Sequence, residues 1–272
     1  MQTTRRFVAA LVLTVLVVSN AAAQNLGTTF SDVWWNPNES GWGMVVAHQQ
    51  DVIFATFYIY GADGSPYWAT GELRKVGTGG PTAPPVVFTG PVYETHGPWF
   101  GGVFNPTLVG IQQVGTATFT ATGAFTATLQ YSVNGVNVTK TIQRQTLSNV
   151  NYSSQYGGGI VYQLSQCIPS QSSNNGKTIS DTAVLTIVQS GTAFHMDAVG
   201  QITNCSFNGT YAQGGSLGQV NGNYSCVTGE AGTFSLYAMQ WTLFGMTAGV
   251  TGQNQACRFD GFLGGITGQR IQ

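Results

Sequence analysis

The sequence predicts an all-β fold of two tandem antiparallel meander modules, the second an eight-stranded up-and-down barrel with two disulfides. Beyond Ala23 no stretch keeps a helical hydrophobic period. Instead, short runs rich in Val, Ile, Thr, Tyr, Phe and Trp alternate with clusters of Gly, Asn, Asp and Ser. All four cysteines lie in the second half, which distinguishes the two modules.

Residues 1–23 have the features of a secretory signal peptide. Arg5 and Arg6 precede an apolar run over 7–18, and three alanines follow at 21–23. The run is shorter than the roughly 20 apolar residues with which a helix crosses a bilayer. We therefore expect cleavage after Ala23, secretion to the periplasm or the medium, and no membrane span in the mature chain.

The first, Trp-rich module is expected over residues 24–147. Asn134-Gly135 is a hairpin signal, because both residues accept positive φ. Glycine and proline predict a loop over 76–85 and an aromatic-rich loop over 97–106. The expected strands cover 41–48, 52–60, 66–72, 86–93, 116–121, 124–132 and 136–143.

A polar linker at 148–154 precedes the second module at 155–272, where tryptophans largely stop and cysteines begin. Eight strand-like runs follow, and eight strands can close an up-and-down sheet. A two-sheet sandwich has the same strand spacing and stays an alternative. The runs cover 159–167, 183–189, 193–199, 204–211, 219–226, 232–237, 245–252 and 257–264.

The four cysteines of an exported chain are expected to form two disulfides, with three possible pairings. Cys205 and Cys226 lie 9 residues before and 11 residues after the Gly214-Gly215 turn, so a plain hairpin centred at this turn brings them opposite each other. Elimination pairs Cys167 with Cys257. That bond would join the first strand run to the last and favours closure, because bonded cysteines need Cα atoms within about 7 Å. The spacing offers no paired zinc ligands, so we expect no metal site.

Charge is sparse along the chain. Charged residues make up 7% of it, against about 25% in an average soluble domain. Nine Lys and Arg, less the two arginines of the signal peptide, leave seven against ten acids, a net charge of −3. This balance predicts no nucleic-acid partner and suits an extracellular module.

Residues 34–43 read Trp-Trp-Asn-Pro-Asn-Glu-Ser-Gly-Trp-Gly, with three tryptophans in ten positions. Together with 54–64, 131–136 and 140–145, this motif resembles a family of secreted proteobacterial β modules that carry a WWNP-ESGWG motif. The resemblance covers roughly residues 32–145. It implies secretion and modularity, and it implies no reaction. The second half is similar, in outline only, to calycin-like barrels of the lipocalin and avidin type.

The tryptophan motif has two interpretations. As structure, its indoles plug one end of the fold, each burying on the order of 200 Å², while acid and amide side chains accept hydrogen bonds from indole or turn N–H groups. As function, exposed indoles stack on sugar rings while acid and amide groups bind hydroxyls. Neighbours in a strand point to opposite faces, so Trp34 and Trp35 are not expected to lie in the core together. The candidate ligand-binding residues are Trp34, Trp35, Asn36, Glu39, Trp42, Trp68 and Trp99.

Nothing in the sequence identifies a catalytic site or a cofactor. Glu94 with His96, and His195 with Asp197, are two residues apart and share a strand face, but no nucleophile accompanies them. We therefore expect a secreted, non-catalytic binding or surface module that recognises glycan or another extracellular ligand. A structural or adhesive protein that self-associates through β edges is the first alternative. A hydrolase built around one of the histidines is the second.

Overall fold

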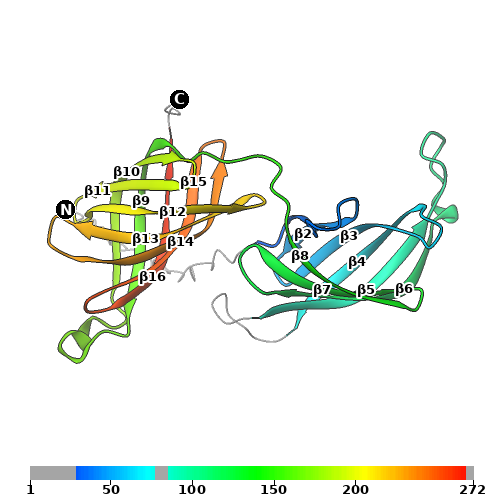
Figure 1. Ribbon diagram of the computed structural model, residues 1–272, viewed down its shortest axis with the longest axis horizontal. Helices are drawn as coiled ribbons and strands as arrows, with labels where there is room; N and C mark the ends of the chain where they lie inside the picture. Colours follow the sequence, from blue (N-terminus) through cyan, green and yellow to red (C-terminus); the bar gives the residue numbers. More distant parts are fainter. Residues whose placement is uncertain (1–28, 77–84, 268–272) are drawn as a thin grey trace, which may run out of the picture.

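The computed structural model describes residues 29–76 and 85–267 and contains two closed antiparallel β-barrels of eight strands each (Figure 1). In each barrel every strand pairs with the next along the chain, and the last strand pairs with the first. The all-β prediction is confirmed, and closure of the second module excludes the sandwich. The first module is a barrel as well, whereas the sequence predicted only a meander there.

The first barrel is closed by a strand that was not expected. Four residues, Asp32–Trp35, are too few to show a hydrophobic alternation, yet they pair with both neighbouring strands and complete the barrel. The predicted signal peptide at 1–23 and most of the predicted loop at 76–85 lie outside the described residues. The strands are β1 (Asp32–Trp35), β2 (Gly43–Gln49), β3 (Val52–Tyr60), β4 (Pro66–Val76), β5 (Val86–His96), β6 (Gly110–Ala121), β7 (Thr126–Val133) and β8 (Val136–Arg144).

The second barrel contains all eight expected strands, and the last residue of the predicted linker, Ser154, begins the first of them. Two short 3-10 helices, η1 (Pro106–Leu108) and η2 (Pro169–Asn174), lie in loops, and no helix among the described residues could span a membrane. The strands are β9 (Ser154–Ser165), β10 (Thr178–Ser190), β11 (Ala193–Gly200), β12 (Asn204–Gly214), β13 (Leu217–Cys226), β14 (Ala231–Thr242), β15 (Gly245–Asn254) and β16 (Arg258–Ile266).

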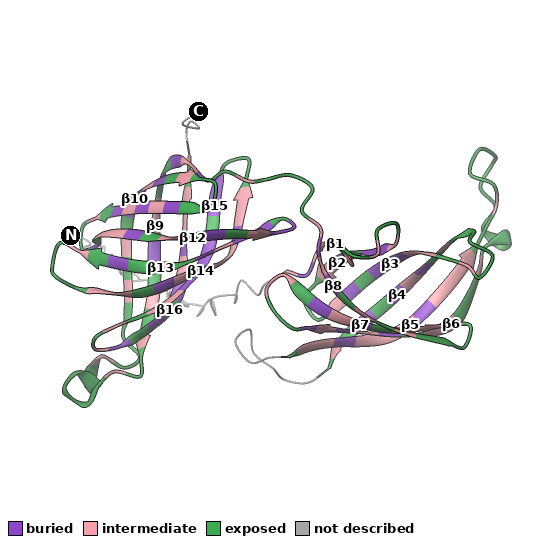
Figure 2. Ribbon diagram, viewed as in Figure 1, coloured by how far each residue is buried: buried purple, intermediate pink, exposed green. Residues whose placement is uncertain are grey.

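Burial alternates along the strands, so apolar side chains fill both interiors (Figure 2). In β3, for example, Ile53, Ala55 and Phe57 are buried, whereas Phe54 and Tyr58 point outward. An eight-stranded barrel is just wide enough for side chains to fill it. The surfaces open to a ligand are therefore the outer faces and the barrel ends.

Both disulfides lie in the second barrel and join the expected cysteines. Cys205 and Cys226 are directly paired residues of β12 and β13. The Cys167–Cys257 bond connects the segment after β9 to the residue before β16. Strands β9 and β16 are neighbours in the barrel. The turn between β12 and β13 is centred on Gly215 and Ser216, one residue later than expected, with Gly215 at φ +60°.

Candidate functional site

Trp34 is a core residue of the first barrel. Its side chain is 0% exposed, and its indole N–H donates to the Phe30 carbonyl oxygen at 3.0 Å. Phe119 packs edge-on against it at 4.9 Å between ring centroids. A ligand cannot reach this ring, so the expectation that Trp34 belongs to a binding platform is wrong.

Strand β1 is short and pairs with β8 at only two positions. The turn at residues 36–42, which follows β1, adds side-chain contacts to β8 and so holds the barrel closed. Lys140 of β8 forms a 2.7 Å ion pair with Glu39, and its ammonium lies 5.7 Å from the Trp42 ring centroid. The Trp42 indole N–H donates to Glu39 Oε2 at 2.9 Å. The hydrogen bond from Lys140 also holds the pKa of Glu39 below its ordinary value.

Asn36 shapes the start of the same turn. Its side-chain oxygen accepts from the Asn38 backbone N–H at 2.9 Å, and its carbonyl oxygen accepts from the Glu39 N–H at 3.0 Å. Gly41 adopts φ +116°, which side chains disfavour. These contacts are the ones that the structural interpretation predicts, in which acid and amide groups accept hydrogen bonds from indole and turn N–H groups. They involve Asn36, Glu39 and the half-buried Trp42.

An aromatic row crosses the outer face of the first barrel from β1 to β4. Gly43 pairs with Tyr58, and Tyr58 pairs with Trp68. Trp34 of β1 pairs with Met44 of β2, and the same register, continued by one residue, places Trp35 opposite Gly43. Side chains at paired positions share a face, so Trp35, Tyr58 and Trp68 form a row across three interstrand spacings, roughly 14 Å.

Gly43 provides the space for the middle ring. A Cβ at this position would lie 2.2 Å from the Tyr58 hydroxyl oxygen and 2.7 Å from the Trp34 carbonyl oxygen. The Tyr58 side chain therefore extends over β2 toward β1, and burial raises the pKa of its hydroxyl. The Trp35 indole nitrogen is covered and, in the part of the chain that is described, has no acceptor.

The outer end of the row is open to solvent. Trp68 is 54% exposed, and Phe54 and Tyr60 on the same face of β3 are 50% and 56% exposed. Thr56 and Thr70 pair directly between β3 and β4 and add two hydroxyls beside the rings. Tyr58 is not among the residues expected from the sequence, although its signal was present: aromatic residues occupy the outward positions of the run at 52–60.

Trp99 lies outside this row. It follows β5 in the expected aromatic loop, is 72% exposed, and contacts Phe100 at 6.0 Å between ring centroids. Of the seven candidate residues, the fold therefore brings Trp35 and Trp68 into one row. It places Asn36, Glu39 and Trp42 together in the adjoining turn, buries Trp34, and separates Trp99 from the others.

The histidines do not form a catalytic arrangement. His195 Nε2 lies 3.2 Å from Asp197 Oδ2, and the Ser206 hydroxyl donates to Asp197 Oδ1 at 2.5 Å. A catalytic triad needs the histidine between the serine and the acid, whereas here the acid lies between them. Glu94 accepts instead from the Tyr67 hydroxyl at 3.1 Å, and no contact joins it to His96.

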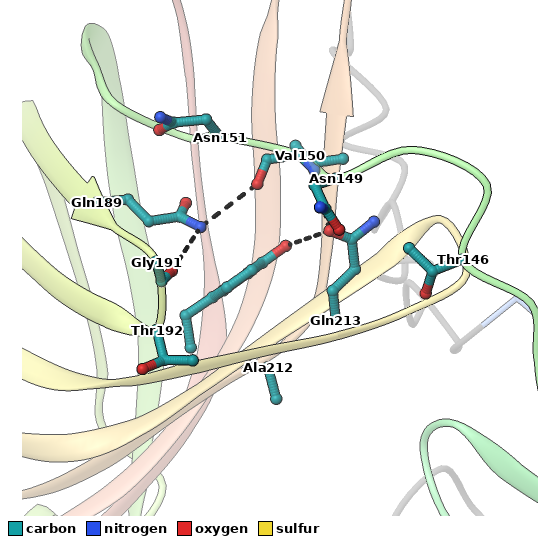
Figure 3. Close-up of a pocket in the computed structure, with 10 residues that line it drawn as sticks. Thr146, Asn149, Val150, Asn151, Gln189, Gly191, Thr192, Ala212 and Gln213 are labelled. Carbon is teal, nitrogen blue, oxygen red and sulfur yellow. Dashed lines mark hydrogen bonds between the residues drawn. The ribbon is translucent and has the colours of Figure 1, made fainter.

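A cleft of about 480 Å³ lies between the linker and the second barrel (Figure 3). Its lining is uncharged and rich in amides. The Gln189 side chain donates to the Val150 carbonyl oxygen at 3.3 Å, and the Gln213 side chain accepts from the Val150 N–H at 2.9 Å and from the Tyr211 hydroxyl at 3.1 Å. These side-chain amides attach the linker to the barrel, so the residues that line the cleft have a structural role.

Among residues 29–76 and 85–267, no group of three or more His, Cys, Asp and Glu side chains could hold a metal ion. No protein-family model, curated protein or solved structure matches the chain. The resemblance of the first half to secreted modules stays a prediction.

Proposed function

We propose that this chain is a secreted, non-catalytic binding module that recognises glycan through the row Trp35, Tyr58 and Trp68. The observation that carries the proposal is the alignment of three rings across four strands, with a glycine under the middle ring. Aromatic faces stack on the C–H faces of sugars, and a row of this span suits an oligosaccharide better than a single sugar.

The chemistry around the rings favours a neutral ligand. Thr56 and Thr70 lie beside the row on β3 and β4, and Gln143 pairs with Trp35 across β1 and β8. Hydroxyl and amide groups can exchange hydrogen bonds with sugar hydroxyls. None of these three side chains is charged. Glu72, which pairs with Phe54 on the same face, forms an ion pair with Arg74, so its charge already has a partner.

The exposure of the outer rings also supports a binding role. Single apolar side chains on a surface are ordinary, but a contiguous apolar patch usually marks an interaction site. Phe54, Tyr60 and Trp68 are each at least half exposed on neighbouring strands. Burying a large apolar side chain contributes about 1.5–3 kcal/mol, which a ligand that covers this face would recover in part.

The alternatives have less support. Assembly through β edges needs unpaired strands, whereas both sheets close on themselves. A hydrolase needs a nucleophile beside its base, and the Ser206 hydroxyl donates to the acid instead.

Binding to neutral polysaccharides tests the proposal, measured by pull-down with insoluble ones and by retarded migration in native gels that contain soluble ones. Trp68→Ala should weaken binding about tenfold or more, because it removes the most exposed ring of the row and aromatic anchors carry much of the binding energy of an interface. Trp99→Ala is the matched control, because it removes another exposed indole outside the row. Equal binding by wild type and Trp68→Ala, or a loss confined to Trp99→Ala, would reject the row as the site.

A further inference from the structure

A cavity of about 180 Å³ opens at one end of the second barrel, on a different module from the aromatic row. It lies at the end that contains the Cys205–Cys226 disulfide. Its walls are aromatic and aliphatic, and Glu230 is the one charged residue among those that line it. An apolar cavity of about 150 Å³ can hold a benzene ring, so this one can accommodate a group of that size.

The aromatic part of the wall consists of Tyr162, Phe207, Tyr224 and Phe259. Phe207 and Tyr224 stack with their ring centroids 5.4 Å apart. Phe259 contacts Tyr224 at 5.7 Å and Tyr162 at 5.4 Å. Phe207, Tyr224 and Phe259 are at most 8% exposed, so mutual packing fixes these rings in the cavity wall.

The Glu230 carboxylate is held at the rim by neutral donors. Its Oε1 atom accepts from the Tyr224 hydroxyl at 2.7 Å and from the Asn254 side-chain amide at 2.9 Å. In the described part of the chain no donor reaches Oε2, and no Lys or Arg forms an ion pair with Glu230. The negative charge therefore has no cationic partner among the described residues.

The other charged residues described near this end of the second barrel do not neutralise the Glu230 carboxylate. The Asp181 carboxylate accepts hydrogen bonds from the backbone N–H groups of residues 201–203. Lys177 and Arg258 adjoin the same end of the barrel, but neither lines the cavity. A ligand in the cavity thus meets four rings and one carboxylate.

We propose that this cavity binds a small organic cation, the ammonium group of a primary or methylated amine. Aromatic faces attract a cation within about 6 Å of the ring centroid, most strongly where water is excluded. Glu230 Oε2 supplies the opposite charge at the mouth, and the aliphatic wall accepts the carbon substituents. A neutral ligand of the same shape lacks both electrostatic interactions.

Choline and its neutral carbon isostere 3,3-dimethyl-1-butanol are suitable probes. Titration calorimetry should show saturable choline binding to the full chain, with the isostere about tenfold weaker or worse. Glu230→Gln keeps the shape and an acceptor for Tyr224 but removes the charge, so it should weaken choline binding about tenfold and leave the isostere unchanged. The matched control is Asp260→Asn, which removes one charge from β16 outside the cavity lining and should change neither affinity.

A second variant keeps the test decisive if Glu230→Gln folds poorly. Ile202 is 63% exposed at the mouth, so Ile202→Lys should fold and should weaken choline binding by placing a competing ammonium there. Equal affinities for choline and its isostere would overturn the proposal. So would the absence of saturable choline binding, unchanged choline binding in Glu230→Gln or Ile202→Lys, or an equal loss in Asp260→Asn.

Discussion

The carboxylate of Asp32, in the first barrel, accepts two hydrogen bonds from Ser216 in the second. The donors are the Ser216 backbone N–H at 2.9 Å and its hydroxyl at 3.1 Å. The same carboxylate forms a 3.1 Å ion pair with Arg144, whose side chain is 0% exposed and lies 4.8 Å from the Trp34 ring centroid. One acid therefore connects the core of the first barrel to the β12–β13 hairpin of the second.

Asp32→Ala should destabilise the first barrel by about 3–5 kcal/mol, because it leaves the Arg144 charge buried without its partner. Burial already lowers the pKa of Arg144, and the Asp32 hydrogen bond opposes that effect. Ser216→Ala, which removes only the hydroxyl donor, should cost about 1 kcal/mol or less. Urea unfolding measures both. A loss below about 1 kcal/mol in Asp32→Ala would contradict this description of the ion pair.

Reduction of the disulfides should destabilise the second barrel alone, since it holds all four cysteines. The two bonds close loops of different size, with sequence separations of 90 and 21 residues. Loop entropy then assigns about 4.5 kcal/mol to Cys167–Cys257 and about 3.5 kcal/mol to Cys205–Cys226. Replacing each pair by serine and comparing unfolding free energies tests the order. An equal shift of the first barrel's transition on reduction would be inconsistent with this assignment.

The parts of this fold that local sequence encodes were predictable, and the parts that depend on register were not. The Asn134-Gly135 hairpin has positive φ at both residues, as expected. The Cys205–Cys226 pair follows from symmetry about a turn. By contrast, which of Trp34 and Trp35 points inward depends on how β1 pairs with its neighbours.

The aromatic row illustrates the same limit at the site. Its members come from separate strands, and Gly43 contributes by lacking a side chain. Hydrophobic alternation identifies the outward face of each strand, but it does not give the register between strands. The row therefore became evident only when the paired positions of β2, β3 and β4 were known.

His48 should make the first barrel less stable at mildly acidic pH. The Phe30 N–H donates to its Nδ1 at 3.2 Å, so its Nε2–H donates to the Gln50 carbonyl oxygen at 2.7 Å in the neutral form. Burial lowers the pKa of His48 from an ordinary value of 6.5. Below that pH the unfolded chain takes up a proton that the folded chain does not, so the unfolding free energy falls.

His48→Gln should therefore flatten the pH dependence of unfolding between pH 7.5 and the lowered pKa. His195 supplies a contrast, because the hydrogen bond with Asn208 raises its pKa. The stabilisation from protonated His195 is present below pH 6.5 and is lost as the pH rises through the folded-state pKa. His195→Gln should therefore change the slope of the unfolding free energy against pH in the direction opposite to His48→Gln. Unfolding curves at several pH values measure both variants. The same slope in all three proteins would show that neither ring titrates differently on folding.

Gly43→Ala should disturb the aromatic row without removing any ring. The added Cβ would lie 2.7 Å from a backbone oxygen and 2.2 Å from the Tyr58 hydroxyl, so the strand or the tyrosine must move. Overpacking of this kind typically costs about 1–3 kcal/mol, and the displaced ring should weaken polysaccharide binding. Gly157→Ala is the matched control, because its Cβ would meet nothing within 4 Å and its stability should stay within about 0.5 kcal/mol of wild type. If Gly43→Ala keeps both full stability and full affinity, then Tyr58 has no fixed place over Gly43 and the row is not preorganised.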